Sequence, residues 1–402
     1  MYLVSVSITK ATPGSQTSLR EANRARIVDA VKRHGGLTQV ELAGATGLSP
    51  ATVSNIVKEL TGTGVLHTTM TTRSGRRAQH VTLARKLGIV AGVHISTRHM
   101  RVALSDVTNT VVAEHNMPLA KDHRADNELD KATRLIADML ESVDASMDEI
   151  LAVGIAVPAP IDVTTGEISR WGLMRGWDGI SIADLMHRRI KRPVFVDNEA
   201  NLAALAEFRV GASRGRTNSI YLRIGQGIGA GLILNGGVFR GFESAAGEFG
   251  HMTIDEGGKL CRCGNRGCLE AIAGGPAILE GLRESNGPQK LTDVVVHAIA
   301  GDPICIRAIA DAGRHIGIAA ANVCNLIAPE RIVVGGELAR AGELLLGPLR
   351  HSLERSVVMG SAKVADIVQS QLGDRAELVG AILYAIDRTE IGADDPFSQT
   401  PG

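Results

Sequence analysis

Apolar residues recur at helical spacing in the first part of the chain, and glycines or small polar residues separate the runs. The pattern predicts a helix over residues 19–34, which two successive glycines end. Thr38 predicts the N-cap of a second helix, because Glu41 three residues on completes a capping box. Gly47 ends that helix, and Ser49-Pro50 predicts the N-cap and first turn of a third helix.

The same spacing predicts which residues of these helices face inward. In the first helix they are Leu19, Ala22, Ile27, Ala30 and Val31. In the third they are Val53, Ile56, Val57 and Leu60. Two alternating runs follow in VLHTTMTTRSGRRAQHVTL, residues 65–83, and flank a turn rich in arginine. Three helices followed by such a hairpin predict a winged helix-turn-helix domain over residues 19–84, with residues 1–18 as a flexible tail.

From Gly88 the pattern changes to buried strands and amphipathic helices. LGIVAGVHI, MRVALSDV and VVAEHNMPL read as three consecutive strands, and a helix is expected at about residues 127–143. A second series of strands and helices begins with the glycine-rich hairpin SIYLRIGQGIGAGLILNGGVF. The repetition predicts a two-lobed α/β body, with one lobe at 88–206 and the other at 207–390. The last helix is expected to pack back on the first lobe, and residues 391–402 read as a tail.

Composition narrows the class of protein. The chain has 402 residues, 44% of them hydrophobic, which suits two or three globular domains. We expect a cytoplasmic protein, because the sequence shows neither a signal peptide nor a run of about 20 apolar residues. The formal net charge is zero, yet residues 19–84 hold nine Lys and Arg against four Asp and Glu. A basic segment joined to an acidic body is typical of a nucleic-acid-binding module on a carrier.

The third helix and the hairpin turn carry the polar residues that we predict to contact DNA. A helix-turn-helix places its second helix in the major groove, and a cationic wing suits phosphates or the minor groove. The candidates are Thr38, Gln39, Ser49, Thr52, Ser54, Asn55, Lys58, Arg73, Arg76 and Arg77. The alternative is a three-helix module that binds another protein.

Three of the five cysteines fall in one short stretch, CRCGNRGCLE at residues 261–270. With a histidine ten residues earlier, the spacing is H-x9-C-x-C-x4-C, formed by His251, Cys261, Cys263 and Cys268. Three thiolates and an imidazole make a closed tetrahedral set, which structural zinc sites favour. The alternative is a cluster of reduced cysteines without a metal. Glu248 and Glu270 flank this set, and carboxylates accept hydrogen bonds from the hydroxyls of a sugar.

Residues 88–390 resemble the ROK family of repressors and sugar kinases, which has an actin-like ATPase fold. The resemblance rests on IGQGIGAGL at 224–232, EFGH at 248–251 and CRCGNRGCLE at 261–270. With the winged helix in front, the whole chain resembles the repressor branch, which includes xylose and N-acetylglucosamine repressors. The resemblance implies the four zinc ligands named above. It also implies a sugar site formed by Asn198, Glu199, Glu248, His251 and Glu270.

The phosphate-handling motifs of ROK kinases are altered in this sequence. The first strand of the body has His94 and Ser96 where the kinases carry Asp and Gly. Gln226 replaces a Thr in the nucleotide loop, and Glu199 stands where the base is an Asp. The glycines of the two nucleotide loops remain as Gly225, Gly227, Gly229, Gly335 and Gly336. A base displaced by about 1 Å loses on the order of 100-fold in rate.

The sequence therefore predicts a regulator that senses a sugar and has lost phosphoryl transfer. Its expected partners are operator DNA, a sugar or sugar-derivative effector, and further copies of the same chain in a homodimer or homotetramer. Two other readings stay open at this point. The body could retain sugar kinase activity, or the chain could act through protein contacts with no sugar.

Overall fold

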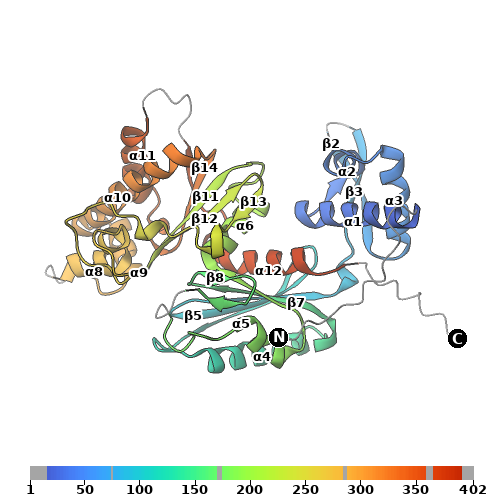
Figure 1. The fold of residues 1–402 in the computed structure, drawn as a ribbon, viewed down its shortest axis with the longest axis horizontal. Helices are drawn as coiled ribbons and strands as arrows, with labels where there is room; N and C mark the ends of the chain where they lie inside the picture. The colour runs from blue at the N-terminus through green and yellow to red at the C-terminus, as the bar shows by residue number, and fades with distance from the viewer. Residues whose placement is uncertain (1–15, 74–75, 170–173, 284–287, 359–364, 392–402) are drawn as a thin grey trace. The chain divides into compact units, whose positions relative to one another are not determined.

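The structure is a computed structural model that describes residues 16–73, 76–169, 174–283, 288–358 and 365–391 (Figure 1). The chain divides into two compact units. The head unit contains the residues up to 89, together with 106–110 and the segment from 386. The body unit contains residues 90–105 and 111–385. None of the described helices is both long and apolar enough to cross a bilayer.

The head is a three-helix domain with a small sheet, as the sequence predicted. Its elements are α1 (Gln16–His34), β1 (Leu37–Thr38), α2 (Gln39–Thr46), α3 (Pro50–Gly62), β2 (Leu66–Arg73) and β3 (Arg76–Leu83). The strands are antiparallel in the order β1-β3-β2, and β2 and β3 form the hairpin of the wing. The inward residues predicted on α3 are all buried.

Local capping explains where the head helices begin and end. The Thr38 hydroxyl accepts the Glu41 amide at 3.3 Å, and the Glu41 carboxylate accepts the Thr38 amide at 2.8 Å. This reciprocal pair is the predicted capping box of α2. Gly47 ends α2 with a φ of 71°, in the left-handed region that glycine enters without penalty. Ser49 caps α3 with Pro50 in its first turn.

The first head helix differs from the prediction in two ways. It begins at Gln16, so three residues assigned to the tail belong to the helix. Leu19 is 65% exposed and Ala22 is also exposed, whereas Ile27 and Val31 are buried. Helical spacing marked both ends of α1 as apolar, but only its second half packs against the rest of the head.

The first lobe of the body is a mixed sheet covered by helices. The sheet order is β10-β7-β4-β5-β6, and a short hairpin, β8-β9, follows β7. The elements are β4 (Ile89–Ile95), β5 (His99–Asp106), β6 (Val111–Pro118), α4 (Ala125–Ser142), β7 (Ile150–Val157), β8 (Ile161–Asp162), β9 (Glu167–Ile168), α5 (Ile182–Ile190) and β10 (Val194–Asn198). The three consecutive strands and the helix after them agree with the sequence.

The second lobe repeats the plan of a sheet with helices. Its sheet order is β13-β12-β11-β14-β15, in which β11 and β12 form the predicted antiparallel hairpin. The elements are α6 (Glu199–Val210), β11 (Ser219–Ile224), β12 (Ile228–Leu234), β13 (Gly237–Phe239), α7 (Glu270–Ala273), α8 (Gly275–Arg283), α9 (Leu291–Ile299), α10 (Pro303–Ile327), β14 (Arg331–Gly335), α11 (Glu343–Ser356), β15 (Asp366–Gln369) and α12 (Ala376–Arg388).

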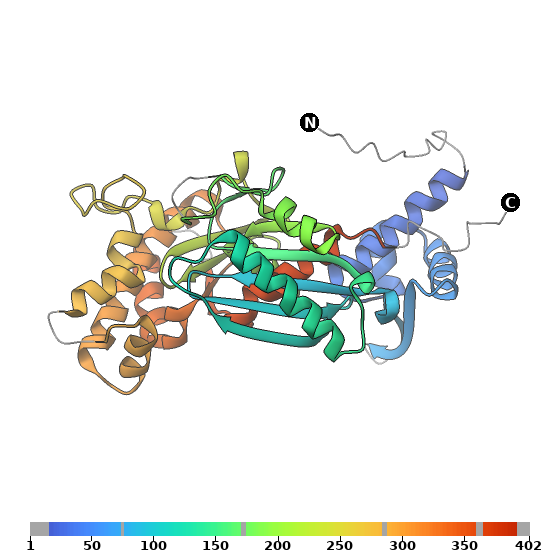
Figure 2. The ribbon, with the colours of Figure 1, turned by 90° about the horizontal axis from the view of Figure 1, so that it is seen from below.

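Two helices, α6 and α12, lie between the two sheets of the body. In Figure 1 α12 runs along the boundary between the sheets, and in Figure 2 it lies behind the strands of the first lobe. A Cβ on Gly154 of β7 would stand 1.9 Å from the Ala381 carbonyl oxygen, and one on Gly380 equally close to that of Leu202. Glycine at both positions lets α12 approach β7 and α6 at backbone contact. This packing brings the first turns of α6 and α12 to Arg223, near the end of β11.

Candidate functional sites

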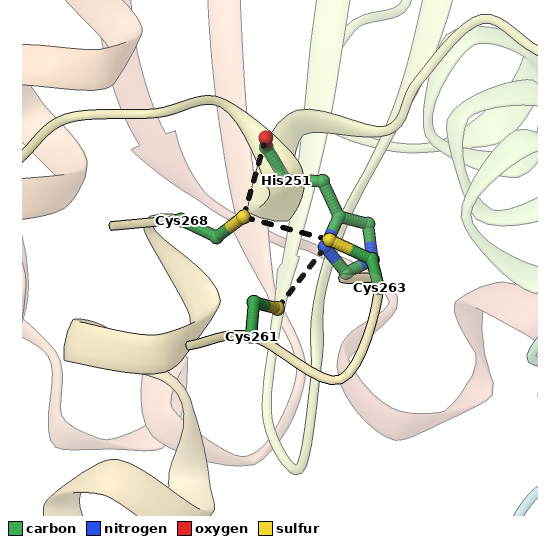
Figure 3. Close-up of side chains that lie close together, drawn as sticks. All are labelled: His251, Cys261, Cys263 and Cys268. Atoms are coloured by element: carbon green, nitrogen blue, oxygen red, sulfur yellow. Dashed lines mark hydrogen bonds between the residues drawn. The ribbon is translucent and has the colours of Figure 1, made fainter. Parts of the chain in front are cut away.

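The four predicted metal ligands come together in the second lobe. His251 ends the short 3₁₀ helix Phe249–His251, and the cysteines lie on the loop that leads to α7 (Figure 3). An isolated bridge between Thr253 and Cys268 closes the loop. The Cys261 Sγ lies 3.6 Å from His251 Nδ1, and the Cys263 Sγ lies 3.6 Å from that of Cys268. All four ligand atoms lie within 4.8 Å of one another.

This donor set fits a tetrahedral cation. Ligand atoms about 2.0–2.3 Å from a zinc ion stand roughly 3.5–3.8 Å apart along the edges of a tetrahedron, which matches the two separations of 3.6 Å. Burial and the neighbouring thiols raise the pKa of Cys268 to about 12. A bound cation would therefore be needed to hold this sulfur as a thiolate near neutral pH. A site closed by four protein ligands is structural rather than catalytic.

Both carboxylates beside the cluster are held by its surroundings. His251 Nε2, the ring nitrogen turned away from the sulfurs, lies 3.7 Å from Glu248 Oε2. Glu270 begins α7 and accepts the Ile228 amide at 2.9 Å. The Arg262 guanidinium donates to the other Glu270 oxygen at 2.8 Å. The loop thus fixes two carboxylates and an imidazole beside the glycine-rich turn between β11 and β12.

A second polar cluster is buried in the body and is built around Arg223 of β11. Its Nε lies 3.1 Å from Glu199 Oε1 and 3.0 Å from Glu377 Oε1. The other Glu199 oxygen lies 2.8 Å from His94 Nε2. Glu199, Glu377 and His94 are all less than 7% exposed. These four residues come from β4, α6, β11 and α12, and we call them the Arg223 network.

The network sets the charge state of Glu199. Burial alone would raise its pKa, but Arg223 and then His94 hold the pKa of this carboxyl below its ordinary value. Burial opposes the charge of Arg223 as well, yet Glu199 and Glu377 raise the pKa of the guanidinium. His99 lies beside the network, with its ring centroid 5.4 Å from that of His94. Burial, and then the nearby His94, lower the pKa of His99 to about 4.

Two of the five residues predicted to contact the sugar make hydrogen bonds and ion pairs within the protein. Both Glu199 oxygens are used inside the Arg223 network, because α6 buries the first residue of its helix. Asn198 caps α6, where its side-chain oxygen accepts the Ala200 amide at 2.8 Å. Its side-chain nitrogen donates to the Ala159 carbonyl at 3.0 Å. Glu248, His251 and Glu270 remain together beside the Cys/His cluster.

The two glycine loops of the sequence meet in the structure. The Gly225 amide donates to the Gly227 carbonyl at 3.0 Å, which makes the tight turn before Gly229 of β12. Gly336 follows Gly335 at the end of β14 with a φ of 84°. A Cβ on Gly225 would stand 3.4 Å from the Arg223 guanidinium and 3.8 Å from the Glu337 carboxylate. An arginine and a glutamate of the chain itself therefore lie beside the loop.

In the head, the predicted DNA contacts divide into exposed and engaged side chains. Ser49, Ser54, Asn55, Lys58 and Arg77 are exposed. Ser49 and Thr52 are hydrogen-bonded to each other at the start of α3, and Gln39 is bonded to Gln79. Thr38 is only 5% exposed and caps α2, so a role in DNA contact is corrected to a structural one. Arg73 and Arg76 pair at the tip of the β2-β3 hairpin, but their side chains lie outside the described residues.

A groove runs along α3 on the side of the first head helix. It is lined by Leu19 and Arg20 from α1 and by Asn55 and Lys58 from α3, among others. Arg20 donates to Glu59 at 2.6 Å and Arg24 lies 3.3 Å from the same carboxylate. The exposed Leu19 therefore borders the polar face of α3 rather than the core of the head.

Sequence reasoning missed the arginines at these sites. Arg223 interrupts the apolar strand SIYLRI, and a cation in such a run is a signal that could have been followed. Arg240 was also missed, although its guanidinium donates to buried Asp197 at 2.6 Å. The carboxylates that pair with these arginines lie far away in the sequence, so the periodicity of apolar residues could not predict the pairs.

Comparison with known proteins assigns the chain that carries these sites to a family. The profile described as "ROK family" matches residues 90–388, and "Winged helix-turn-helix DNA-binding" matches residues 20–66. The first match covers well over half of the sequence. The chain belongs to the ROK family.

Its relatives cover nearly the full chain. The xylose repressor of Caldicellulosiruptor bescii is 28% identical over 93% of this chain and 97% of its own length. The DNA-binding transcriptional dual regulator NagC of Escherichia coli is 28% identical over 91% and 94%. Among solved structures, a ROK family transcriptional regulator described as a homolog of E. coli MLC protein aligns with a TM-score of 0.75 at 24% identity, over 92% and 96% of the two chains. A ROK family glucokinase from Streptomyces griseus, in complex with glucose and AMPPNP, aligns at 0.63 and 26%, over 74% of this chain and 99% of its own.

Proposed function

We propose that this protein is a DNA-binding transcriptional regulator that responds to a sugar and represses genes of carbohydrate metabolism. The observation that carries the proposal is that a winged-helix domain and a ROK body occur in one chain. The third helix of the winged-helix domain exposes Ser54, Asn55 and Lys58. Relatives that align with this chain over nearly their whole length are named repressors. A helix-turn-helix reads operator DNA through such a polar helix face.

The sugar site of this proposal lies beside the Cys/His cluster. Glu248, His251 and Glu270 offer two carboxylates and an imidazole, held in place by the loop. Zinc bound by His251 Nδ1 and the three sulfurs would be structural, and it would fix the ring so that Nε2 faces the sugar. Asn198 would border the site and Glu199 would not contact the sugar.

The body would not transfer phosphate at a useful rate. A general base must reach the proton that it removes, and the carboxylate at that position is tied to Arg223 and His94. Its pKa is held below the ordinary value, which makes it a weaker base still. The Glu337 carboxylate also stands beside the loop that would hold phosphates, where its negative charge would oppose theirs.

The sugar would bind one conformation of the chain more tightly than another, and would thereby shift the population toward that conformation. Because the two conformations would differ in their affinity for DNA, sugar binding would change DNA binding. A dimer or tetramer would present two heads to the half-sites of a palindrome. The head contacts that we retain are Ser54, Asn55, Lys58 and Arg77, with Arg73 and Arg76 at the tip of the wing and Ser49 and Thr52 at the start of the third helix.

A gel-shift experiment on the DNA upstream of the chain's own and neighbouring genes tests the proposal. We expect a shift that one sugar of a panel alters. Asn55→Ala with Lys58→Ala should abolish the shift and leave sugar binding intact, whereas Glu248→Ala should keep the shift and remove the sugar response. A wild-type protein that binds none of these DNAs would overturn the regulator. ATP turnover with any hexose at rates typical of kinases would support the alternative, an active ROK kinase.

A further inference from the structure

One large aromatic side chain stands in water beside the proposed sugar site. The chain has only six phenylalanines, and Phe242 is 84% exposed, the most exposed of those described. Leaving a phenyl ring in water forfeits the gain of burying it, so a ligand that covered this ring would gain that free energy. Phe242 begins the 3₁₀ turn Phe242–Ser244, on the segment between β13 and Glu248.

The loop that carries Phe242 is fastened at both ends. At its start, Arg240 donates to Asp197, the residue before Asn198, and stacks over the ring of Tyr384 with its guanidinium carbon 5.5 Å from the centroid. The Arg240 carbonyl also accepts the Ala246 amide at 2.9 Å, which closes the loop on itself. At its end, the Gly247 carbonyl accepts the Ala230 amide of β12 at 3.0 Å. The tip with Phe242 lies between these two anchors, and the Phe242 carbonyl accepts the Ala245 amide at 3.1 Å.

The tip itself is held in an unusual backbone conformation. Glu243 has φ 50° and ψ 30°, and Ser244 has φ 57°, the left-handed region that residues with a Cβ seldom adopt. Two such residues in succession leave the turn with conformational energy that a different loop conformation can release. Strained backbone of this kind is common at ligand clamps and switch segments.

The position of the loop fits a role in sugar binding. The turn Phe242–Ser244 lies against β8 of the first lobe, just after Ala159, whose carbonyl binds Asn198. The loop leads directly into Glu248 of the second lobe. The loop therefore joins a contact with β8 of the first lobe to Glu248 of the second lobe. Small-molecule sites commonly combine a few polar groups with an aromatic wall.

We propose that the segment Gly241–Gly247 is a lid that closes when sugar binds, and that Phe242 covers the apolar C–H face of the sugar ring. The inference rests on the proposed function, because it assigns a residue to the same site. The carboxylates and the imidazole bind hydroxyls, while the phenyl ring excludes water from the opposite face of the sugar. A neutral pyranose presents both kinds of surface.

Titration calorimetry on the full-length chain tests the lid, with D-glucose, D-xylose and N-acetyl-D-glucosamine as the probes. Phe242→Ala should weaken binding of the responding sugar about tenfold, the effect of burying roughly a quarter of the ring surface. Phe242→Tyr should retain the affinity. Phe239→Ala, an exposed phenylalanine on β13, is the matched control and should leave the affinity unchanged.

The fluorescence of Phe242→Trp supplies a second measurement. On addition of the sugar its emission should shift to shorter wavelength, because the ring leaves water. Wild-type affinity in Phe242→Ala together with no shift in Phe242→Trp would overturn the lid and leave the proposed function standing. A wild-type chain that binds none of the three sugars would overturn both.

Discussion

The body holds two polar clusters that differ in how the chain assembles them. The Cys/His cluster draws its four ligands from residues 251–268, a single loop closed by local hydrogen bonds. The Arg223 network draws its four members from positions 94, 199, 223 and 377, on four separate elements. The first cluster can be predicted from a short sequence motif. The second exists only because α6 and α12 are packed between two sheets.

The two clusters also differ in what holds them together. Three sulfurs and an imidazole would be stabilised as a set by a cation, and removal of the cation would leave a small loop without support. The Arg223 network is compensated internally, since a buried guanidinium balances two carboxylates and a histidine accepts or donates to one of them. Loss of its central charge would leave two carboxylates facing each other out of water.

Removal of the metal should have the largest effect. We expect one zinc per chain by elemental analysis, and Cys263→Ser should abolish the zinc and the sugar response together. Cys324→Ser, on α10 and apart from the cluster, is the control and should keep both. A wild-type chain free of zinc after purification without chelators would contradict the assignment of the cluster.

Breaking the Arg223 network should be nearly as damaging to the fold. Arg223→Met should lower the free energy of unfolding by about 3–5 kcal/mol, because it leaves Glu199 and Glu377 buried without a counter-charge. Arg262→Met is the matched control: this arginine is 60% exposed, and loss of its pair with Glu270 should cost less than about 1 kcal/mol. Urea unfolding measures both. If the two substitutions lowered the free energy of unfolding equally, the Arg223 network would be no more buried in solution than the pair of Arg262 with Glu270.

The half-buried His99 should make the stability depend on pH. Its pKa falls from 6.5 to about 4 in the fold, so the unfolded chain binds a proton more readily. The stability associated with neutral His99 is complete above pH 6.5 and is lost as the pH falls toward 4. The loss should be on the order of 1–2 kcal/mol at this half-buried site.

His99→Gln should remove that part of the pH dependence in urea unfolding between pH 7 and pH 4. Comparison with the wild type at each pH cancels the effect of acid on the Cys/His cluster, which both proteins share. Parallel pH profiles for the two proteins would mean that His99 titrates normally in the fold.

A local cap in the head should show the smallest effect. Thr38→Ala should destabilise the head by about 1 kcal/mol, because α2 loses its capping box, and should leave the preferred DNA sequence unchanged. Asn55→Ala should do the opposite, with little change in stability and a loss of sequence preference. Thermal unfolding and gel shifts on matched operators measure the two. A changed sequence preference in Thr38→Ala would return this residue to the DNA contacts.

Much of the head was predictable because its signals are local. The capping box of Thr38, the left-handed Gly47 and the buried face of α3 each depend on residues within one or two turns. Leu19 was misplaced because helical spacing shows that a face is apolar but not where along the helix the neighbouring elements end. The burial of Glu199 was missed for a related reason, since nothing near it in sequence supplies Arg223.

The sequence by itself determined the order of the elements, the helix boundaries near their caps, and the four candidate metal ligands. Each of these features depends on residues that lie within about twenty positions of one another in the sequence. Over such short separations the rest of the fold has little influence on which residues meet. Only the tertiary structure decided that the Glu199 carboxylate pairs with Arg223 and that the Asn198 side chain caps α6. It also decided that Phe242 stands in water. These outcomes depend on how α6 and α12 pack between the sheets and on how the ends of the loop that carries Phe242 are held. Such packing is stabilised by contacts between residues far apart in the sequence, so no single stretch of residues predicts it.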